Sequence, residues 1–213
     1  MSTEAAPTRG VFVCFEGGEG AGKSTQSRLL VDRLRADGHV VRPTYEPGDT
    51  PVGAELRRLL LDPATGDLAP RTEALIYAAD KAEHVATVVE PALARGEVVV
   101  TDRYVDSTLA YQGAGRTLAT DEVERVARWA TGDLRPDLTV LLDLDPTAGL
   151  GRFSGRDRIE GAGAEFHDRV RAGFLALAAT DPATYLVLDA RAPVAELHES
   201  VHVRVAELLG GRR

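Results

Sequence analysis

The feature that most constrains the fold is a glycine-rich stretch near the N-terminus, GGEGAGKS, at residues 17–24. Its spacing, Gly-x-x-x-x-Gly-Lys-Ser, is that of a phosphate-binding loop, in which backbone amides surround an anion and the lysine adds a positive charge. Such a loop needs a buried strand before it and a helix after it. An apolar run at residues 11–16 and a helical pattern at 23–37 supply both. The sequence therefore predicts a site for a nucleotide's phosphates.

Short apolar runs alternate with helical patterns along the rest of the chain. The expected strands are residues 11–16, 39–45, 97–101, 138–143 and 185–189. Helical patterns lie at 23–37, 52–61, 71–94, 121–131, 146–151, 165–180 and 194–209. This alternation predicts an α/β fold, a five-stranded parallel sheet with helices on both faces, and the 213 residues suit one domain, 1–213. Ligands then bind beyond the carboxyl ends of the strands.

Charge and cysteine content narrow the class of protein. A formal net charge of -8 argues against DNA or RNA as the main partner, since such proteins usually carry a basic surface. The single cysteine, Cys14, excludes a disulfide within the chain; we expect it to be a small buried hydrophobe in a reducing cytoplasm. No apolar run approaches the roughly 20 residues that span a bilayer, so no membrane partner is expected. Residues 1–10 lack the apolar core of a signal peptide and are expected to form a loose tail.

The end of a central strand narrows the type of phosphate site. The run VVVTDRY places Arg103 directly after Asp102, whereas motor and transporter ATPases usually end this strand in Asp-Glu. The Asn-Lys-x-Asp that reads guanine in GTPases is missing from the sequence. Asp102 and the Ser24 hydroxyl are expected ligands of Mg²⁺, and the planar fork of Arg103 fits a second phosphate. An ion pair between Asp102 and Arg103 is the structural alternative.

The stretch GRFSGRDRIEGAG, residues 151–163, interrupts the apolar pattern and holds three arginines, Arg152, Arg156 and Arg158. We expect a short flexible lid that brings arginine to a phosphate site. A solvated surface loop is the alternative.

Several stretches together resemble thymidylate kinases: FEGGEGAGKSTQ, EPG at 46–48 and DRYVDSTLAYQGAGR at 102–116. RTEALIYAADKAEHV and GRFSGRDRIE match two further segments of that family, and the resemblance runs from about residue 11 to 209. It implies the P-loop nucleoside monophosphate kinase fold and transfer of the γ-phosphoryl of ATP to dTMP. It also implies Mg²⁺ as cofactor, ATP and dTMP as small-molecule partners, and a homodimer.

The resemblance assigns roles at the phosphates and the sugar. Glu19 would accept a hydrogen bond from the 3′-hydroxyl of the acceptor, Arg103 and Arg57 would reach its phosphate, and Glu46 would lie near sugar and metal. A solvent-facing Glu19 and a helix-capping Glu46 are the alternatives. The donor's phosphates would lie in a loop made of Gly17, Gly18, Glu19, Gly20, Ala21, Gly22, Lys23, Ser24 and Thr25.

The base would lie against the expected helix 71–94. On a helical wheel, Lys81 and His84 fall near the line of Tyr77, opposite an apolar stripe that begins at Leu75 and Ala79. The resemblance has Tyr77 stack on thymine and Lys81 donate to its O4; packing at the edge of the core is the alternative for Tyr77. The remaining assignments are Thr108 and Gln112 at the base edge, Tyr111 against the sugar 2′ position, and Ser107 as a ligand or a helix cap.

The chain departs from the family pattern at four positions. Lys81 stands where arginine is commoner, and Tyr45 and Asp49 replace the usual Arg and Gly around Glu-Pro-Gly. One branch of the family carries a catalytic arginine at the position of Gly20, and another supplies it from the lid. The chain reads as the second, bacterial-type branch, with Lys23, Arg103, Arg152, Arg156 and Arg158 as expected catalytic residues. A kinase for another pyrimidine such as dUMP, or a non-catalytic nucleotide-binding switch, remains an alternative.

Overall fold

The computed structural model describes residues 9–116, 118–150, 159 and 162–211. Its strands are β1 Phe12–Glu16, β2 Val41–Tyr45, β3 Val98–Asp102, β4 Leu138–Asp143 and β5 Tyr185–Asp189. They form one sheet in the order β2-β3-β1-β4-β5, with every neighbouring pair parallel. The predicted five-stranded parallel sheet is confirmed. The tail at 1–10 and the lid at 151–163 fall largely outside the described residues and stay predictions.

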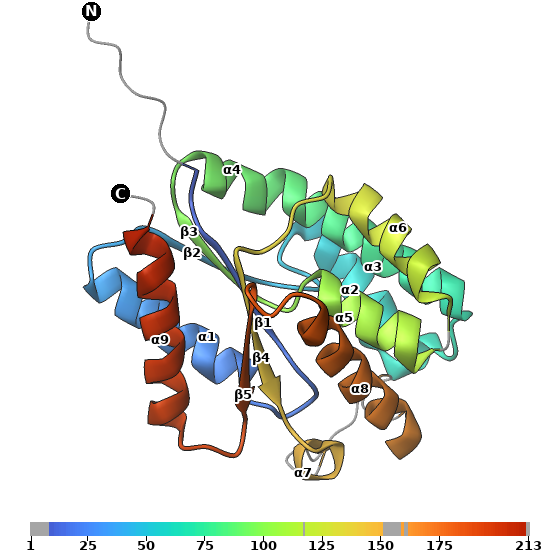
Figure 1. Cartoon of the computed structure of the whole chain (residues 1–213). Helices are drawn as coiled ribbons and strands as arrows, with labels where there is room; N and C mark the ends of the chain where they lie inside the picture. The colour runs from blue at the N-terminus through green and yellow to red at the C-terminus, as the bar shows by residue number, and fades with distance from the viewer. Residues whose placement is uncertain (1–8, 117, 151–158, 160–161, 212–213) are drawn as a thin grey trace, which may run out of the picture.

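Helices cover both faces of the sheet (Figure 1). One face carries α1 Lys23–Ala36 and α9 Val194–Gly210, which pack on each other and on the sheet. The opposite face carries α3 Pro70–His84, α4 Glu90–Ala94, α5 Val105–Thr108, α6 Thr120–Thr131 and α8 Ala164–Thr180. Two short elements lie at the carboxyl ends of the strands, α2 Pro51–Leu61 and α7 Pro146–Leu150.

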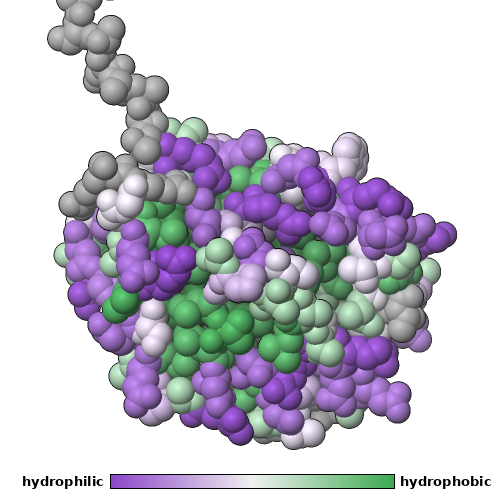
Figure 2. All heavy atoms as spheres, viewed as in Figure 1, coloured by the Kyte–Doolittle hydropathy of each residue, from purple (hydrophilic) through white to green (hydrophobic). Residues whose placement is uncertain are grey.

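The alternation of side chains along β1 divides the core into two layers. Val13 and Phe15 join the cluster beneath α1 and α9, whereas Phe12 and Cys14 join the cluster on the opposite face. Cys14 is 1% exposed, which confirms it as a buried hydrophobe. Figure 2 shows an apolar area over the edge strand β5, between α9 and α8. Val187, a residue of β5, is 46% exposed. The edge strand is therefore less covered than the central ones.

The predicted helix 71–94 is three segments in line. Between α3 and α4 lies a π-helical turn, Val85–Val89. Pro91 sits in the first turn of α4, has no N–H to donate, and its ring would crowd the carbonyl four residues earlier. A widened turn just upstream accommodates that proline.

Two sequence-based expectations on the same face are wrong. Leu75 is 59% exposed and Ala79 is exposed, so the apolar stripe fails along α3, whose buried face instead includes the polar residues Glu73, Asp80, Lys81 and His84. The stretch after β3, which we did not predict as helix, forms α5 and a π-helical segment, Leu109–Gly115. Its glycines suggest a loop, but an added Cβ at Gly115 would lie 2.7 Å from the Phe166 ring, so glycine permits the close approach of α8.

Candidate active site

The phosphate-binding loop joins β1 to α1 at the carboxyl edge of the sheet. Lys23 is the first residue of α1 and is 7% exposed. Its Nζ donates to the carbonyl oxygens of Gly17, at 3.0 Å, and Gly18, at 2.8 Å. The ammonium is thus held over the loop, beside the N-terminus of α1, where a phosphate group is favoured.

Gly20 has no room for a side chain. Its φ is +69°, and an added Cβ would lie 2.5 Å from the carbonyl oxygen of Gly149 in α7. Gly149 in turn approaches the loop so closely that its own added Cβ would lie 2.1 Å from the carbonyl oxygen of Glu19. A loop arginine at position 20 is therefore incompatible with this packing, which gives the sequence departure at Gly20 a physical reason.

Arg103 follows β3 and lies at the centre of a polar cluster. Its Nη2 donates to Glu19 Oε1, at 2.5 Å, and to the Tyr111 hydroxyl, at 3.2 Å, while Nη1 donates to Ser107 Oγ, at 3.1 Å. Its φ of 72° is rare for a residue with a side chain and marks a constrained position. The alternative of an ion pair with Asp102 is wrong, since Arg103 pairs with Glu19.

Glu19 faces this cluster rather than solvent, so the solvent-facing alternative is wrong. Burial alone would raise the pKa of its carboxyl. The charges of Arg103 and Lys23 and the Tyr111 hydroxyl, which donates at 2.8 Å, outweigh burial and lower that pKa to about 2. Glu19 is therefore a fixed anion at neutral pH.

Ser107 lies inside α5 and does not cap it, because the N-cap residue is Tyr104. Its hydroxyl donates to Glu16 Oε2 at 2.6 Å and accepts from Arg103. Glu16 is fully buried and also accepts from the backbone amides of Tyr104 and Ser107. The buried carboxylate thus fixes the start of α5 and, through Ser107, one side of the Arg103 fork.

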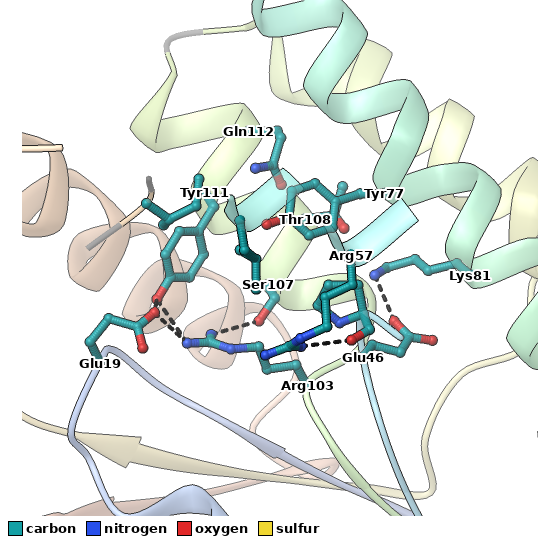
Figure 3. A pocket seen from close by; sticks show the side chains of 13 residues that line it. Glu19, Glu46, Arg57, Tyr77, Lys81, Arg103, Ser107, Thr108, Tyr111 and Gln112 are labelled. Atoms are coloured by element: carbon teal, nitrogen blue, oxygen red, sulfur yellow. Dashed lines mark hydrogen bonds and ion pairs between the residues drawn. The ribbon is translucent and has the colours of Figure 1, made fainter. Parts of the chain in front are cut away.

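A cavity of about 230 Å³ opens in front of Arg103 (Figure 3). Every residue expected to bind the acceptor lines it, and they come from the loop after β1, the turn after β2, α2, α3, the end of β3, α5 and the π-helical segment. These residues are Glu19, Glu46, Arg57, Tyr77, Lys81, Arg103, Ser107, Thr108, Tyr111 and Gln112. The cavity is also lined by Pro47, Leu61 and Ile159.

A second cavity, of about 830 Å³, adjoins the first over the phosphate-binding loop. Of the expected donor-site residues, it is lined by Glu19, Gly20, Gly22, Lys23, Ser24 and Thr25, but not by Gly17, Gly18 or Ala21. The two cavities share Glu19, Glu46, Arg57 and Arg103. A group bound in one can therefore meet a group bound in the other at the Arg103 cluster.

Ser24 and Asp102 are suited to a magnesium ion. The Ser24 hydroxyl donates to Asp102 Oδ2 at 2.5 Å, at the wall of the larger cavity. Within the described ranges no group of three His, Cys, Asp or Glu side chains could enclose a metal ion. Two side-chain oxygens open to a cavity suit Mg²⁺, which completes its coordination with phosphate oxygens and water.

Glu46 is held by two basic side chains of α3. Its Oε2 accepts from Lys81 Nζ at 2.6 Å, and its Oε1 lies 2.7 Å from Nδ1 of His84. The other ring nitrogen of His84 lies 2.5 Å from the Thr44 hydroxyl, which donates to Asp49 at 2.6 Å. Lys81 and Asp49, two of the positions at which the chain departs from the family pattern, thus belong to one hydrogen-bonded network that is buried except at Asp49. The alternative that Glu46 caps a helix is wrong, because its side chain pairs with the basic side chains of Lys81 and His84 and not with a helix end.

The Lys81 ammonium is not freely available to a ligand, because Lys81 is 2% exposed and paired with Glu46. Its Nζ also lies 5.9 Å from the centre of the Tyr77 ring, as neighbours one turn apart should.

Arg57 donates to the Pro47 carbonyl at 2.7 Å and lines both cavities, whereas its neighbour Arg58 has a side chain that is 61% exposed. Arg152, Arg156 and Arg158 lie outside the described residues.

Comparison with known proteins agrees with this geometry. A family model described as thymidylate kinase matches residues 15–201. The chain belongs to the thymidylate kinase family. Curated thymidylate kinases similar to it include those of Cutibacterium acnes, 56% identical over 94% of this chain and 98% of that protein, and Leifsonia xyli subsp. xyli, 53% identical over 92% and 94%. The protein of Deinococcus radiodurans is 50% identical over 94% and 98%.

The family assignment confirms the resemblance seen in five stretches of sequence. Three residues that touch the expected ligand-binding side chains of this family member were missed: His84 beside Glu46, Glu16 beside Ser107, and Glu73 beside Gln112. Only His84 had a signal, since the helical wheel placed it on the line of Tyr77 and Lys81. In the part of the chain that the structure describes, no helix is long and apolar enough to cross a membrane.

Proposed function

We propose that this member of the thymidylate kinase family transfers the γ-phosphoryl group of ATP to dTMP, giving ADP and dTDP. One observation carries the proposal: the cavity over the loop for a nucleotide's phosphates and a smaller cavity adjoin and share Arg103 and Arg57. An acceptor phosphate bound by these arginines would lie next to the outermost phosphate of a donor on the loop. This arrangement suits transfer between two phosphates.

In the proposed reaction, an oxygen of the dTMP phosphate attacks the γ-phosphorus of ATP in line. The bond to the bridging oxygen breaks, and its electrons stay on ADP. The acceptor oxygen is already an anion, so no general base is required. Ser24 and Asp102 would hold Mg²⁺, which when bound neutralises charge on the outer phosphates of ATP. Lys23 and Arg103 position the two reactants and screen their mutual repulsion.

Arginine from residues 151–163 would add the charge that the loop cannot supply at Gly20. The close contact of Gly20 with Gly149 supports a source of arginine outside the loop, because it excludes a side chain at position 20. A cation supplied in this way is worth roughly 10³–10⁵ in rate in phosphoryl transfer. Arg152, Arg156 and Arg158 are the proposed sources.

A coupled assay of ADP release tests the proposal. Turnover with ATP and Mg²⁺ is measured with dTMP, dUMP, dCMP, dGMP and AMP, each over a range of concentrations. We expect kcat/KM to be highest for dTMP. A higher value for dUMP would make the protein a different pyrimidine nucleotide kinase, and ATP hydrolysis that ignores every acceptor would make it a nucleotide-dependent switch.

We further propose that the protein acts in the cytoplasm as a homodimer. An apolar groove between α3 and α6 supports a self-association surface. Leu75 and Val123 line it, together with Leu118 and Val126, and Leu75 is 59% exposed. Burial of such a patch against a second copy would remove apolar surface from water.

A further inference from the structure

The amide of Gln112 is held, on the side away from the cavity, by an ion pair between Glu73 and Arg116. Gln112 is 1% exposed and its Nε2 donates to Oε1 of Glu73 at 3.0 Å. Glu73 is fully buried on α3 and also accepts two bonds from Arg116, from Nε at 3.1 Å and from Nη2 at 3.2 Å. Neither Glu73 nor Arg116 lines the acceptor cavity, whereas Gln112 does. The ion pair therefore reaches the cavity through Gln112. Arg116 also lies over the Phe166 ring, 4.8 Å from its centre, and that ring packs against Tyr111 of the cavity wall.

The chemistry of this contact fixes which way the amide faces. A carboxylate accepts hydrogen bonds and cannot donate one while ionised, and a two-pronged arginine keeps it ionised. Gln112 must therefore turn its NH₂ group toward Glu73. The opposite orientation would set the amide oxygen against a carboxylate oxygen in a buried site, which costs the desolvation of both acceptors.

The carbonyl oxygen of Gln112 is consequently left for the cavity. Figure 3 shows this oxygen directed inward, on the side of Thr108 and Tyr77. Thr108 is 2% exposed, and its Oγ1 has no hydrogen-bond partner among the residues that the structure describes. A buried hydroxyl without a partner beside a fixed carbonyl indicates a polar ligand edge at this end of the cavity.

We propose that Glu73, supported by Arg116, is a specificity-determining positioning residue: it turns the Gln112 carbonyl toward the base, so that the acceptor site requires a pyrimidine with an N3–H. Thymine and uracil carry that donor. Cytosine has a lone pair at N3, which would face the carbonyl oxygen and leave two buried acceptors opposed. The inference rests on the proposed function, since it assumes that the base of a nucleoside monophosphate occupies the cavity.

The test is the variant Glu73→Gln in the full-length protein. A neutral amide at position 73 can present either its oxygen or its NH₂ to Gln112, so the preference for one orientation is lost. We expect the ratio of kcat/KM for dTMP to that for dCMP to fall at least tenfold, mainly through KM. We expect kcat at saturating dTMP to stay within about threefold, because the Arg103 cluster is untouched. A loosened fold would instead lower kcat/KM for dTMP and for dCMP together, and their ratio would not change.

Glu83→Gln is the matched control, since it makes the same change at a part-exposed position of the same helix. It should leave the dTMP-to-dCMP ratio unchanged. If Glu73→Gln shows no cooperative thermal unfolding, Arg116→Gln takes its place, because the Arg116 side chain is 24% exposed and its loss removes the arginine that keeps Glu73 ionised. A protonated Glu73 can donate to Gln112 as well as accept from it, so the amide is no longer held in one orientation. The expected loss of discrimination is again at least tenfold.

The outcomes separate the two proposals. If the wild-type protein phosphorylates dTMP and a folded variant keeps its dTMP-to-dCMP ratio within threefold, the role of Glu73 is wrong and the proposed function stands. If the wild-type protein does not phosphorylate dTMP, the proposed function itself fails. A fall in the ratio for Glu83→Gln equal to that for Glu73→Gln would also overturn the inference, since it would show a general effect of charge on α3.

Discussion

The Tyr111 hydroxyl and the Tyr111 ring do different things. The hydroxyl donates to Glu19 and accepts from Arg103, while the ring lies 6.0 Å, centre to centre, from both Phe166 and Phe174. The hydroxyl therefore tightens the charged cluster, and the aromatic packing holds the ring at the cavity wall. Substitutions can separate the two contributions.

We expect Tyr111→Phe to raise KM for dTMP about threefold to tenfold, because the cluster loses a hydrogen bond worth about 1 kcal/mol. The preference for dTMP over its ribonucleotide counterpart should persist, since the ring remains. Both are measured by steady-state kinetics with the two acceptors. A loss of that preference in Tyr111→Phe would show that the hydroxyl, and not the ring, excludes the 2′-hydroxyl group.

Asp80 is a residue whose charge costs stability. It is 1% exposed; Oδ1 accepts from the Gly48 amide at 3.0 Å, and Oδ2 has no hydrogen-bond partner within the described ranges. Burial, and then the negative charge of Glu46, raise the pKa of Asp80 to about 6. An unfolded chain loses this proton near pH ~3.9. Between these two values the folded state holds a proton that the unfolded state has lost, so stability falls as pH rises toward 6.

Asp80→Asn should therefore raise the free energy of unfolding at pH 8 by about 2 kcal/mol, with the amide oxygen still accepting from Gly48. The gain should be about 1 kcal/mol smaller at pH 5, where the folded wild-type protein is already mostly protonated. Urea unfolding at the two pH values measures it. The exposed Asp67→Asn serves as the control, and an equal gain at both pH values would exclude titration of Asp80 as the cause.

At the scale of elements, the site is assembled by close approaches of backbone. α7 packs against the phosphate-binding loop at Gly149, whose added Cβ would lie 2.1 Å from the carbonyl oxygen of Glu19. Backbone atoms at that distance cannot be accommodated by a side-chain rotation. The loop or α7 must move when position 149 gains a side chain.

We expect Gly149→Ala to lower kcat/KM for ATP at least tenfold, because a displaced Glu19 carbonyl distorts the loop that positions the donor's phosphates. Gly210→Ala in α9 makes the same change where nothing lies within 4 Å and should leave kinetics unaltered. Kinetics at saturating dTMP measure the effect. Wild-type values for Gly149→Ala would show that α7 and the loop are not tightly coupled.

Elements with local chemical signals could be predicted from the sequence, and those that depend on buried polar partners could not. The motif Gly17–Ser24 placed the loop, and helical spacing placed Lys81 beside Tyr77. Spacing failed at Leu75, because α3 buries polar residues that line or support a cavity, and hydrophobicity does not reveal such a face. Glu73 was missed because its partners Gln112 and Arg116 lie far along the chain.

At the scale of the whole molecule, the exposed side of α3 is the surface to test for self-association. Leu75→Glu places a charge in the groove between α3 and α6, where burial against a second copy would cost the desolvation of a carboxylate. We expect the wild-type protein to sediment at twice the chain mass of 22.8 kDa and Leu75→Glu to sediment at the mass of one chain.

Val203→Glu is the control, because Val203 is 48% exposed on α9, on the opposite face of the sheet from α3. It should stay dimeric in sedimentation equilibrium. A wild-type mass of a single chain, or a dimeric Leu75→Glu, would contradict the proposed surface.

The contact between Gly20 and Gly149 also limits the order in which sequence change can occur. An arginine side chain introduced at position 20 would collide with the backbone of α7 at Gly149. The mutation is therefore harmful unless α7 has already moved away. Conversely, once α7 has retreated, the glycine at 149 is no longer required. A lineage carrying this packing can therefore acquire a loop arginine only after a change elsewhere, and laboratory evolution toward that arrangement should recover substitutions in α7 before any at position 20.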